Sequence, residues 1–170
     1  MFKKIVKIFF HRKIKFKKRG SNLIIIGEPI YCINSNVVIG DNVSIYPGVT
    51  FFGKGPIVIG NNVKIGNNVV INAMSEQGIV IKDYAIIAAN TYIIDNNHNI
   101  GKSDLIQKQG FVSKQLMIGE DVWIGASCVI GMGSIINRGA VIGANSFVNT
   151  EIDSYAIAVG NPAKIIKYRE

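Results

Sequence analysis

An aliphatic residue recurs at every sixth position in the C-terminal part of the chain, and this period restricts the fold more than any other feature. The series runs without a slip through Ile118, Ile124, Ile130, Ile136, Ile142 and Val148. An α-helix repeats every ~3.6 residues and a strand every two, so neither alone produces this spacing. A short strand followed by a tight corner does, if each corner turns the chain by about a third of a revolution. Three such edges make a coil of about eighteen residues, and coils stack about 4.8 Å apart.

A second position in each frame supports the same geometry. Four residues after each aliphatic residue the side chain is mostly small or β-branched, as in Val122, Cys128, Ser134, Ala140, Ser146 and Ile152. Glycine or asparagine directly follows the aliphatic residue and supplies the positive φ that tight corners often need. Shorter series precede this one: Ile33, Ile39 and Ile45; Ile59, Ile65 and Ile71; and Ile81, Ile87 and Ile93. With one further frame at Phe51, we expect these residues to point inward in about five coils.

The period defines one all-β domain with two interruptions. Between Phe51 and Pro56 the phase shifts by two residues, which indicates a bulge at a corner. From residue 95 to residue 117 the period disappears, and a polar loop of this length in a regular scaffold is usually functional or disordered. We therefore predict a parallel β-helix over residues 21–170, with an excursion loop at 95–117 and a closing segment at 153–170. A basic leader at 1–20 precedes it.

The excess positive charge of the chain is confined to this leader. Of the 19 lysine and arginine residues in the 170-residue sequence, nine lie within residues 1–19, where none of the 11 acidic residues occurs. The net charge of +8 therefore becomes −1 when residues 20–170 are taken alone. A nucleic-acid-binding domain carries a basic stripe over its folded body. We therefore expect no nucleic-acid partner.

The leader itself has an amphipathic pattern. Its apolar residues recur at helical spacing with lysines between them: Phe2, Ile5, Val6, Phe9 and Phe10. Such a segment can lie on an anionic bilayer, which predicts peripheral membrane contact through residues 1–19. The alternatives are a solvated basic arm or a helix packed on a neighbouring subunit. Lys7 interrupts the apolar run that a secretory signal needs. Two cysteines do not make a disulfide framework, so we expect a cytoplasmic protein, at the inner face of the membrane if the leader binds lipid.

Two histidines are available for acid–base chemistry, and only one lies beside the irregular loop. His11 belongs to the leader, whereas His98 stands in D-N-N-H-N, where the period ends. Imidazole is partly neutral at pH 7 and can remove a proton from an attacking hydroxyl or amine. The alternative is a loop histidine with no role. One histidine cannot supply the three-histidine zinc site of a γ-class carbonic anhydrase, so no metal is expected. Neither Cys32 nor Cys128 suggests a nucleophile, and Cys128 fits a core position.

Residues 57–168 resemble the hexapeptide-repeat acetyltransferases that modify sugars, such as galactoside and maltose acetyltransferases and bacterial polysaccharide O-acetyltransferases. Three segments carry the resemblance: I-V-I-K-D-Y-A-I-I-A-A-N-T-Y-I-I-D-N-N-H, which ends at His98; I-G-E-D-V-W-I-G-A around Trp123; and A-V-G-N-P-A-K-I-I-K at 158–167. The resemblance implies a left-handed β-helix, a homotrimer and acetyl-CoA bound between neighbouring subunits. It implies acetyl transfer to a saccharide hydroxyl in polysaccharide or cell-surface glycan modification, with His98 as the general base.

The resemblance also assigns binding residues. The positions that match CoA contacts in the family are Ala126, Ala144, Asn149, Thr150, Lys164 and Lys167. The two alanines would let backbone groups reach the pantetheine amides, and the two lysines would pair with CoA phosphates as point charges.

The acceptor side is implied by fewer matches. An ungapped alignment places Asn68 near the acetyl group, with a slip to Asn72 as the alternative, and Glu76 at a sugar-binding position. Trp123 is expected to line the acceptor or pantetheine channel, or else to be a buried structural residue. Asp95 or a backbone carbonyl is expected to hold the imidazole in the required tautomer.

Three other functions remain open from the sequence. The same base serves an amine, so N-acetylation of an amino sugar and acetylation of a small-molecule drug are alternatives. A non-catalytic assembly or binding module is the alternative from another class. Such a module should lack the histidine at the loop boundary and the lysines expected at CoA.

Overall fold

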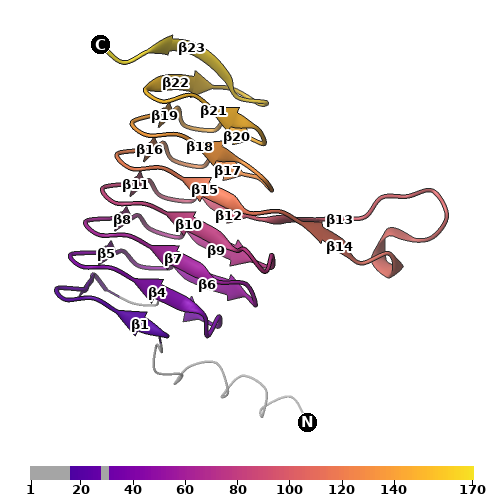
Figure 1. Cartoon of the computed structure of the whole chain (residues 1–170), viewed down its shortest axis with the longest axis horizontal. Coiled ribbons are helices and arrows are strands. Elements are labelled where there is room, and N and C mark those ends of the chain that lie inside the picture. The colour runs from indigo at the N-terminus through magenta and orange to yellow at the C-terminus, as the bar shows by residue number, and fades with distance from the viewer. Residues whose placement is uncertain (1–15, 28–30) are drawn as a thin grey trace.

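The computed structural model describes residues 16–27 and 31–170, which wind into a β-solenoid (Figure 1). Each complete coil contributes one short strand to each of three parallel sheets, called sheets A, B and C, and the chain makes about seven turns. This is the left-handed parallel β-helix that the repeats and the resemblance predict. The two additional coils lie at the ends, where the six-residue period is weak.

The strands of each sheet are stacked in chain order, apart from the insertion described below. Sheet A contains β1 (Lys18–Arg19), β4 (Val37–Ile39), β7 (Ile57–Ile59), β10 (Ile79–Ile81), β15 (Leu116–Ile118), β18 (Ile135–Ile136) and β21 (Glu151–Ile152). Sheet B contains β2 (Ile24–Ile25), β5 (Ser44–Ile45), β8 (Lys64–Ile65), β11 (Ile86–Ile87), β16 (Trp123–Ile124), β19 (Val141–Ile142), β22 (Ala156–Val159) and β23 (Lys164–Tyr168). Sheet C contains β3 (Tyr31–Cys32), β6 (Thr50–Gly53), β9 (Val70–Ala73), β12 (Tyr92–Ile94), β17 (Val129–Ile130) and β20 (Phe147–Val148).

The core is a column of aliphatic side chains along the axis of the solenoid. The six residues of the C-terminal series, Ile118, Ile124, Ile130, Ile136, Ile142 and Val148, are all 0% exposed. Small residues near the corners are buried beside them, and the Ser134 hydroxyl donates to the Gly131 carbonyl at 2.7 Å. The predicted inward positions of this series are therefore confirmed.

One predicted inward residue is wrong. Ile33 is 46% exposed, and the inward position of its coil is taken by Cys32, which pairs in register with the buried Phe51. The connection between β3 and β4 is therefore one residue longer than the six-residue frame assumes. Cys32 is partly buried against the core instead of preceding the first frame.

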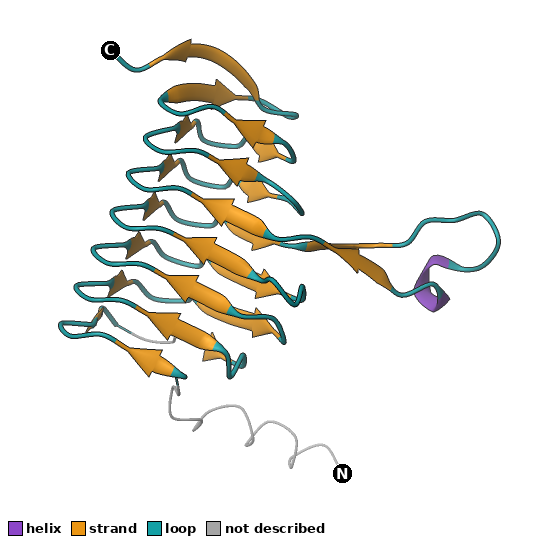
Figure 2. Ribbon diagram, in the orientation of Figure 1, coloured by secondary structure: helices purple, strands orange, loops and turns teal. Residues whose placement is uncertain are grey.

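The excursion loop is an ordered arm that leaves the fourth coil between β12 and β15 (Figure 1). Its strands β13 (Asn96–His98) and β14 (Phe111–Ser113) form an antiparallel hairpin, and a 3-10 turn, η2 (Ile106–Lys108), lies near its tip (Figure 2). The Gln109 side chain closes the tip. Its amide accepts from the Gly101 N–H at 2.8 Å and donates to the Gly101 and Asp104 carbonyls at 2.8 and 2.6 Å.

The last coil ends in β22 and β23. β23 runs antiparallel to β22 and covers the end of sheet B. The Arg169 guanidinium fastens the chain after it, 2.9 Å from the Asp121 carboxylate and 2.8 Å from the Gly139 carbonyl. The Tyr168 hydroxyl also donates to the Asp153 carboxylate at 2.8 Å. Residues 153–170 therefore cover the C-terminal end of the solenoid and are held there by side-chain hydrogen bonds.

At the N-terminal end, most of the leader lies outside the described residues, so the predicted helix and the boundary at residue 20 stay predictions. The first described residues already belong to the solenoid. The Phe16 ring meets the Phe51 ring edge to face, with centroids 5.9 Å apart, and β1 pairs with β4. Within the described ranges, no helix is long and apolar enough to cross a membrane.

Candidate active site

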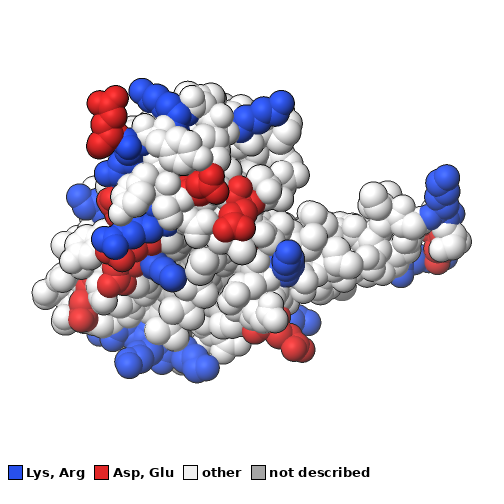
Figure 3. All heavy atoms as spheres, turned by 45° about the horizontal axis from the view of Figure 1, so that its top comes forward, with Lys and Arg blue, Asp and Glu red and all other residues white. Residues whose placement is uncertain are grey.

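The three sheets meet at three edges, and the candidate residues divide between two of them. The B–C edge holds the corners that follow the sheet B strands, and the C–A edge holds the corners that follow the sheet C strands. The arm leaves from the C–A edge of the fourth coil. On the face drawn in Figure 3, acidic and basic side chains are interspersed over the solenoid. Selective binding at these edges must therefore come from local groups.

His98 lies on the arm, three residues beyond its root, and its side chain is exposed. The imidazole Nδ1 lies 3.3 Å from the Gly110 carbonyl oxygen across the hairpin. A carbonyl only accepts hydrogen bonds, so this contact favours the tautomer with the proton on Nδ1. Nε2 is then left with a lone pair that can take a proton from an acceptor.

Asp95 lies at the root of the arm, where its carboxylate binds backbone N–H groups of the preceding coil. It is completely buried and accepts from the Met74 N–H at 2.7 Å and from the Ser75 N–H at 2.9 Å. The backbone carbonyl of Asp95 accepts from the Lys114 N–H at 2.9 Å, which holds the returning strand. Two groups were predicted to orient the His98 imidazole, and the one that contacts it is a backbone carbonyl, that of Gly110. The Asp95 carboxylate instead anchors the arm to the preceding coil.

Replacing Asp95 by asparagine should destabilise the protein by about 1–3 kcal/mol, because one buried N–H would then face an amide NH2 instead of an acceptor. Burial raises the pKa of the Asp95 carboxyl above its usual 3.8, against the effect of the two hydrogen bonds. The folded state thus holds this proton more tightly than the unfolded state, so the carboxyl stabilises most below pH 3.8 and less as pH rises through the folded pKa. Urea unfolding near pH 4 and near pH 7 should show a larger wild-type advantage at the lower pH. Equal stability of both proteins at both pH values would contradict this role.

The two candidate asparagines occupy different places. Asn68 is exposed at a B–C corner with φ of +57°, and its amide donates to the Asn90 side chain at 3.2 Å. Asn72 lies on β9 opposite Ile94, beside the root of the arm, and is only 9% exposed. Its amide nitrogen donates to the Tyr92 hydroxyl at 3.3 Å, while its oxygen has no hydrogen-bond partner among the described residues. Of the two, Asn72 is therefore the one next to the arm.

The predicted acidic residue also lies near the arm. Glu76 is exposed in the C–A corner between β9 and β10, in the turn that Asp95 anchors. Asn96, the first residue of β13, carries a second buried side-chain oxygen without a partner in the described part of the chain. No sequence pattern pointed to Asn96, nor to the Gly110 carbonyl, because both depend on how the hairpin pairs.

Three of the residues expected at CoA follow the B–C edge in the last three coils. Ala126 and Ala144 occupy successive corners, and the Ala126 carbonyl accepts from the Asn145 N–H at 2.9 Å. Lys164 pairs with Val159 at the end of β22, above the same edge. Ala144 and Lys164 are exposed, and Ala126 is half-buried. The B–C edge therefore exposes backbone groups and small side chains in two successive coils, with the Lys164 ammonium above them.

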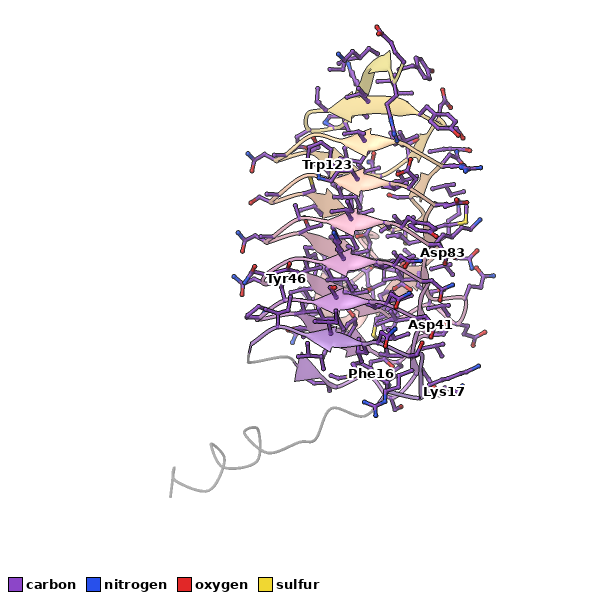
Figure 4. All side chains as sticks on the ribbon, turned by 90° about the vertical axis from the view of Figure 1, so that its left-hand side faces the viewer. Phe16, Lys17, Asp41, Tyr46, Asp83 and Trp123 are labelled. Carbon is purple, nitrogen blue, oxygen red and sulfur yellow. The ribbon has the colours of Figure 1, made fainter. Side chains whose placement is uncertain are left out.

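Trp123 and Lys167 lie on the outer face of sheet B. Trp123 is in register with Val141, which pairs with Ile157, which pairs with Lys167. The indole is 53% exposed and lies at the outer surface of the solenoid (Figure 4). Within one chain Trp123 is therefore not a buried structural residue, and the channel interpretation remains.

The last two residues expected at CoA lie on the other edge. Asn149 and Thr150 follow β20 and are exposed on the C–A side, the side from which the arm leaves two coils below. One chain therefore carries the histidine arm on one edge of sheet C and Ala126, Ala144 and Lys164 on the opposite edge. Sheet C itself separates them.

The remaining reactive groups do not form a second centre. Burial raises the pKa of the Cys32 thiol to about 11, and burial also raises the pKa of the Cys128 thiol. Both thiols are therefore poor nucleophiles near neutral pH. In residues 16–27 and 31–170, no three His, Cys, Asp or Glu side chains come together as a group that can hold a metal ion.

The protein is a parallel β-solenoid with a projecting arm that carries a histidine. Comparisons with known proteins identify the family. Residues 117–157 match the family described as bacterial transferase hexapeptide (six repeats), and residues 56–94 match the hexapeptide repeat of succinyl-transferase. The chain belongs to the hexapeptide-repeat acyltransferases. A search of curated protein sequences gives no significant match.

Solved structures extend the comparison. The chain is similar to AntD, an N-acyltransferase from Bacillus cereus whose structure contains dTDP and coenzyme A, with 25% identity, a TM-score of 0.82 and coverage of 92% of this chain and 86% of AntD. It is also similar to a maltose O-acetyltransferase from Clostridium difficile 630, with 26% identity, a TM-score of 0.63 and coverage of 91% and 71%. A third similar structure is the hexapeptide-repeat acetyltransferase VCA0836 from Vibrio cholerae. It has 25% identity and a TM-score of 0.59, and the match covers 88% of this chain and 72% of VCA0836.

Proposed function

We propose that the protein transfers an acetyl group from acetyl-CoA to a saccharide hydroxyl, in the modification of a polysaccharide or cell-surface glycan. The observation that carries this proposal is His98, exposed on the arm with Nδ1 against the Gly110 carbonyl and with no hydrogen bond to Nε2 from the described residues. The use of CoA is supported by the family and by relatives whose structures contain coenzyme A or 3-hydroxybutyryl-CoA.

The proposed reaction is a direct transfer within a ternary complex. His98 Nε2 takes the proton of the acceptor hydroxyl as its oxygen attacks the thioester carbonyl. The resulting oxyanion is stabilised by backbone N–H groups or by the amide of Asn72 or Asn68. Collapse breaks the carbon–sulfur bond and releases CoA thiolate, which takes up the proton. No acyl-enzyme is required, which agrees with the raised pKa values of both thiols.

We propose that the active form is a homotrimer in which neighbouring chains share each site. The arm lies on one edge of sheet C, and Ala126, Ala144 and Lys164 lie on the other, so a cyclic head-to-tail arrangement would bring the arm edge of one chain to the B–C edge of the next. The arm also exposes large apolar side chains that suit such a contact, with Ile100 78% exposed and Leu105 65% exposed.

N-acylation of a nucleotide-linked amino sugar is the second candidate. It is favoured by the higher structural similarity to AntD, whose complex with dTDP and coenzyme A gives a TM-score of 0.82, against 0.63 for the maltose enzyme. Another AntD structure contains dTDP-4-amino-4,6-dideoxyglucose. The same imidazole removes a proton from an amine during attack, so the arrangement of His98 is compatible with both reactions.

The deciding experiment is a CoA-release assay with acetyl-CoA and 3-hydroxybutyryl-CoA against matched acceptors. The panel contains monosaccharides, maltose and longer oligosaccharides, capsular fragments, and dTDP-sugars with and without an amino group. Turnover on hydroxyl acceptors supports the first proposal, and turnover confined to amino sugars supports the second. Turnover with neither class, in a protein that does not bind CoA, would favour the non-catalytic module.

Replacing Lys164 or Lys167 by glutamine should raise KM for acyl-CoA several-fold and leave kcat nearly unchanged, because an exposed lysine–phosphate contact contributes about 1 kcal/mol. The matched control is Lys82→Gln, which removes an exposed lysine at the A–B edge. Initial rates at varied acyl-CoA concentration separate the two constants. A fall in kcat with unchanged KM would place these lysines outside the CoA site.

A further inference from the structure

The first coil ends the solenoid in an exposed apolar surface. Four isoleucines contribute to it, with relative exposures of 52% for Ile24, 41% for Ile25, 38% for Ile26 and 46% for Ile33. Their exposure has two causes. Ile24 lies in the outward register of Ser44 on sheet B, and Ile33 follows the inward Cys32, so both face outward at the rim of the first coil, whereas Ile25 pairs with Ile45, which is completely buried. Ile25 occupies the same inward position as Ile45. It is exposed because no described coil lies beneath the first one. We call these four residues, with the basic residues described next, the first-coil surface.

Three basic residues stand beside these isoleucines. Lys17, Lys18 and Arg19 are consecutive and exposed, and Lys17 lies at the same end of the solenoid as Phe16 (Figure 4). In the sequence, the first forty residues carry nine of the basic residues and one acid, Glu28. In the structure, the Asp41 carboxylate accepts from Ser21 and lies close enough to Lys18 to feel its charge, so the three cations of this coil outnumber the acid beside them. A surface that is both apolar and cationic needs a partner that is both apolar and anionic.

The candidate partners differ in these two properties. A second copy of the first-coil surface would bring like charges together, and so would the cationic leader as a cap over Lys17, Lys18 and Arg19. A nucleic acid would neutralise the charge but would leave the isoleucines without an apolar phase. An anionic bilayer supplies phosphates for the cations and an interfacial apolar layer for the isoleucines.

We propose that the first-coil surface rests on an anionic lipid bilayer and that the adjoining leader binds the same membrane. The solenoid axis would then stand upright on the membrane, because the first coil is its end. The arm leaves the fourth coil, three coil spacings or roughly 14 Å further along the axis. It extends sideways from the solenoid (Figure 1). This would hold His98 above the bilayer at a level suited to an acceptor attached to a membrane lipid. The docking itself does not depend on the proposed reaction.

The test is flotation of the full chain with vesicles of phosphatidylcholine alone and of phosphatidylcholine mixed with phosphatidylglycerol. The charge variant is Lys17→Gln/Lys18→Gln/Arg19→Gln, and its matched control is Lys82→Gln/Lys102→Gln/Lys108→Gln. The charge variant should partition on the order of a hundred-fold less onto the anionic vesicles, and the control should lose much less than that. Wild-type binding should be weak on pure phosphatidylcholine and should fall as salt is added.

The apolar part is tested separately. Ile24→Gln/Ile33→Gln should weaken anionic-vesicle binding at least ten-fold, whereas Ile100→Gln/Ile106→Gln on the arm should not. Far-UV circular dichroism and thermal melting confirm that each variant is folded, and a misfolded glutamine pair is replaced by Ile24→Ser alone. Deletion of residues 1–15 measures the share of the leader. The proposal is overturned if this deletion abolishes binding while both first-coil variants bind like the wild type, or if the wild type ignores anionic vesicles.

Discussion

Replacing His98 by alanine is expected to lower the turnover number by about 10²–10⁴-fold, the usual contribution of a general base. The acceptor hydroxyl is a weak nucleophile until its proton is removed, and His98 Nε2 is the unoccupied base on the arm. The loss should appear in kcat and in kcat/KM alike, because the imidazole acts only as the new bond forms. Initial rates on the acceptor found in the panel, with saturating acyl-CoA, measure it.

Two controls separate this chemical role from damage to the arm. His98→Ala should bind CoA with unchanged affinity in calorimetry and keep its sedimentation coefficient, because the side chain is exposed and makes one hydrogen bond. Asn97→Ala removes the exposed neighbour on the same strand and should retain most activity. Near-normal turnover by His98→Ala would refute the proposed mechanism, whatever its binding properties.

The sequence predicted the core because the fold imposes the same requirement on every coil. In the central coils, a two-residue strand has one inward position and a three-residue strand of sheet A has two, and a polar residue there would lie in a closed apolar column. A six-residue period in isoleucine is therefore a direct record of burial. The same logic failed at Ile33, because the connection between β3 and β4 adds a residue, and a period carries no information about where a corner lengthens.

The candidate site was predictable only as far as residue identity carries the chemistry. His98 was chosen as the candidate base because it is a histidine at the point where the repeat stops and because the family resemblance aligns it with a catalytic histidine. The hydrogen bonds around it were not, because they join residues whose pairing depends on the path of the arm. The Gly110 carbonyl reaches His98 across a hairpin, and the Asp95 carboxylate binds N–H groups twenty and twenty-one residues away. Both contacts are backbone contacts, and backbone groups leave no trace in a sequence.

Mixed trimers provide the sharpest test of a shared site, and we expect two inactive variants to restore activity to each other. The first is His98→Ala, which removes the base from the arm. The second is Ala144→Trp, which fills the B–C edge where pantetheine is proposed to bind; Ala144 is exposed, so the fold has room for the larger side chain. If each site takes its arm from one chain and its edge from the next, random mixing leaves both parts intact in about a quarter of the sites.

The matched control is the wild type mixed equally with a chain that carries both substitutions. Sites shared between chains again leave about a quarter intact, so the two mixtures should be equally active. If each site lies within one chain, the mixture of the two single variants should be inactive. The control mixture should then keep about half of the wild-type activity. The two chains are co-expressed in equal amounts and all trimers are purified together, without selecting the mixed ones, and CoA release measures the active sites. Because the arm and the alanine edge lie on opposite sides of sheet C, we expect equality.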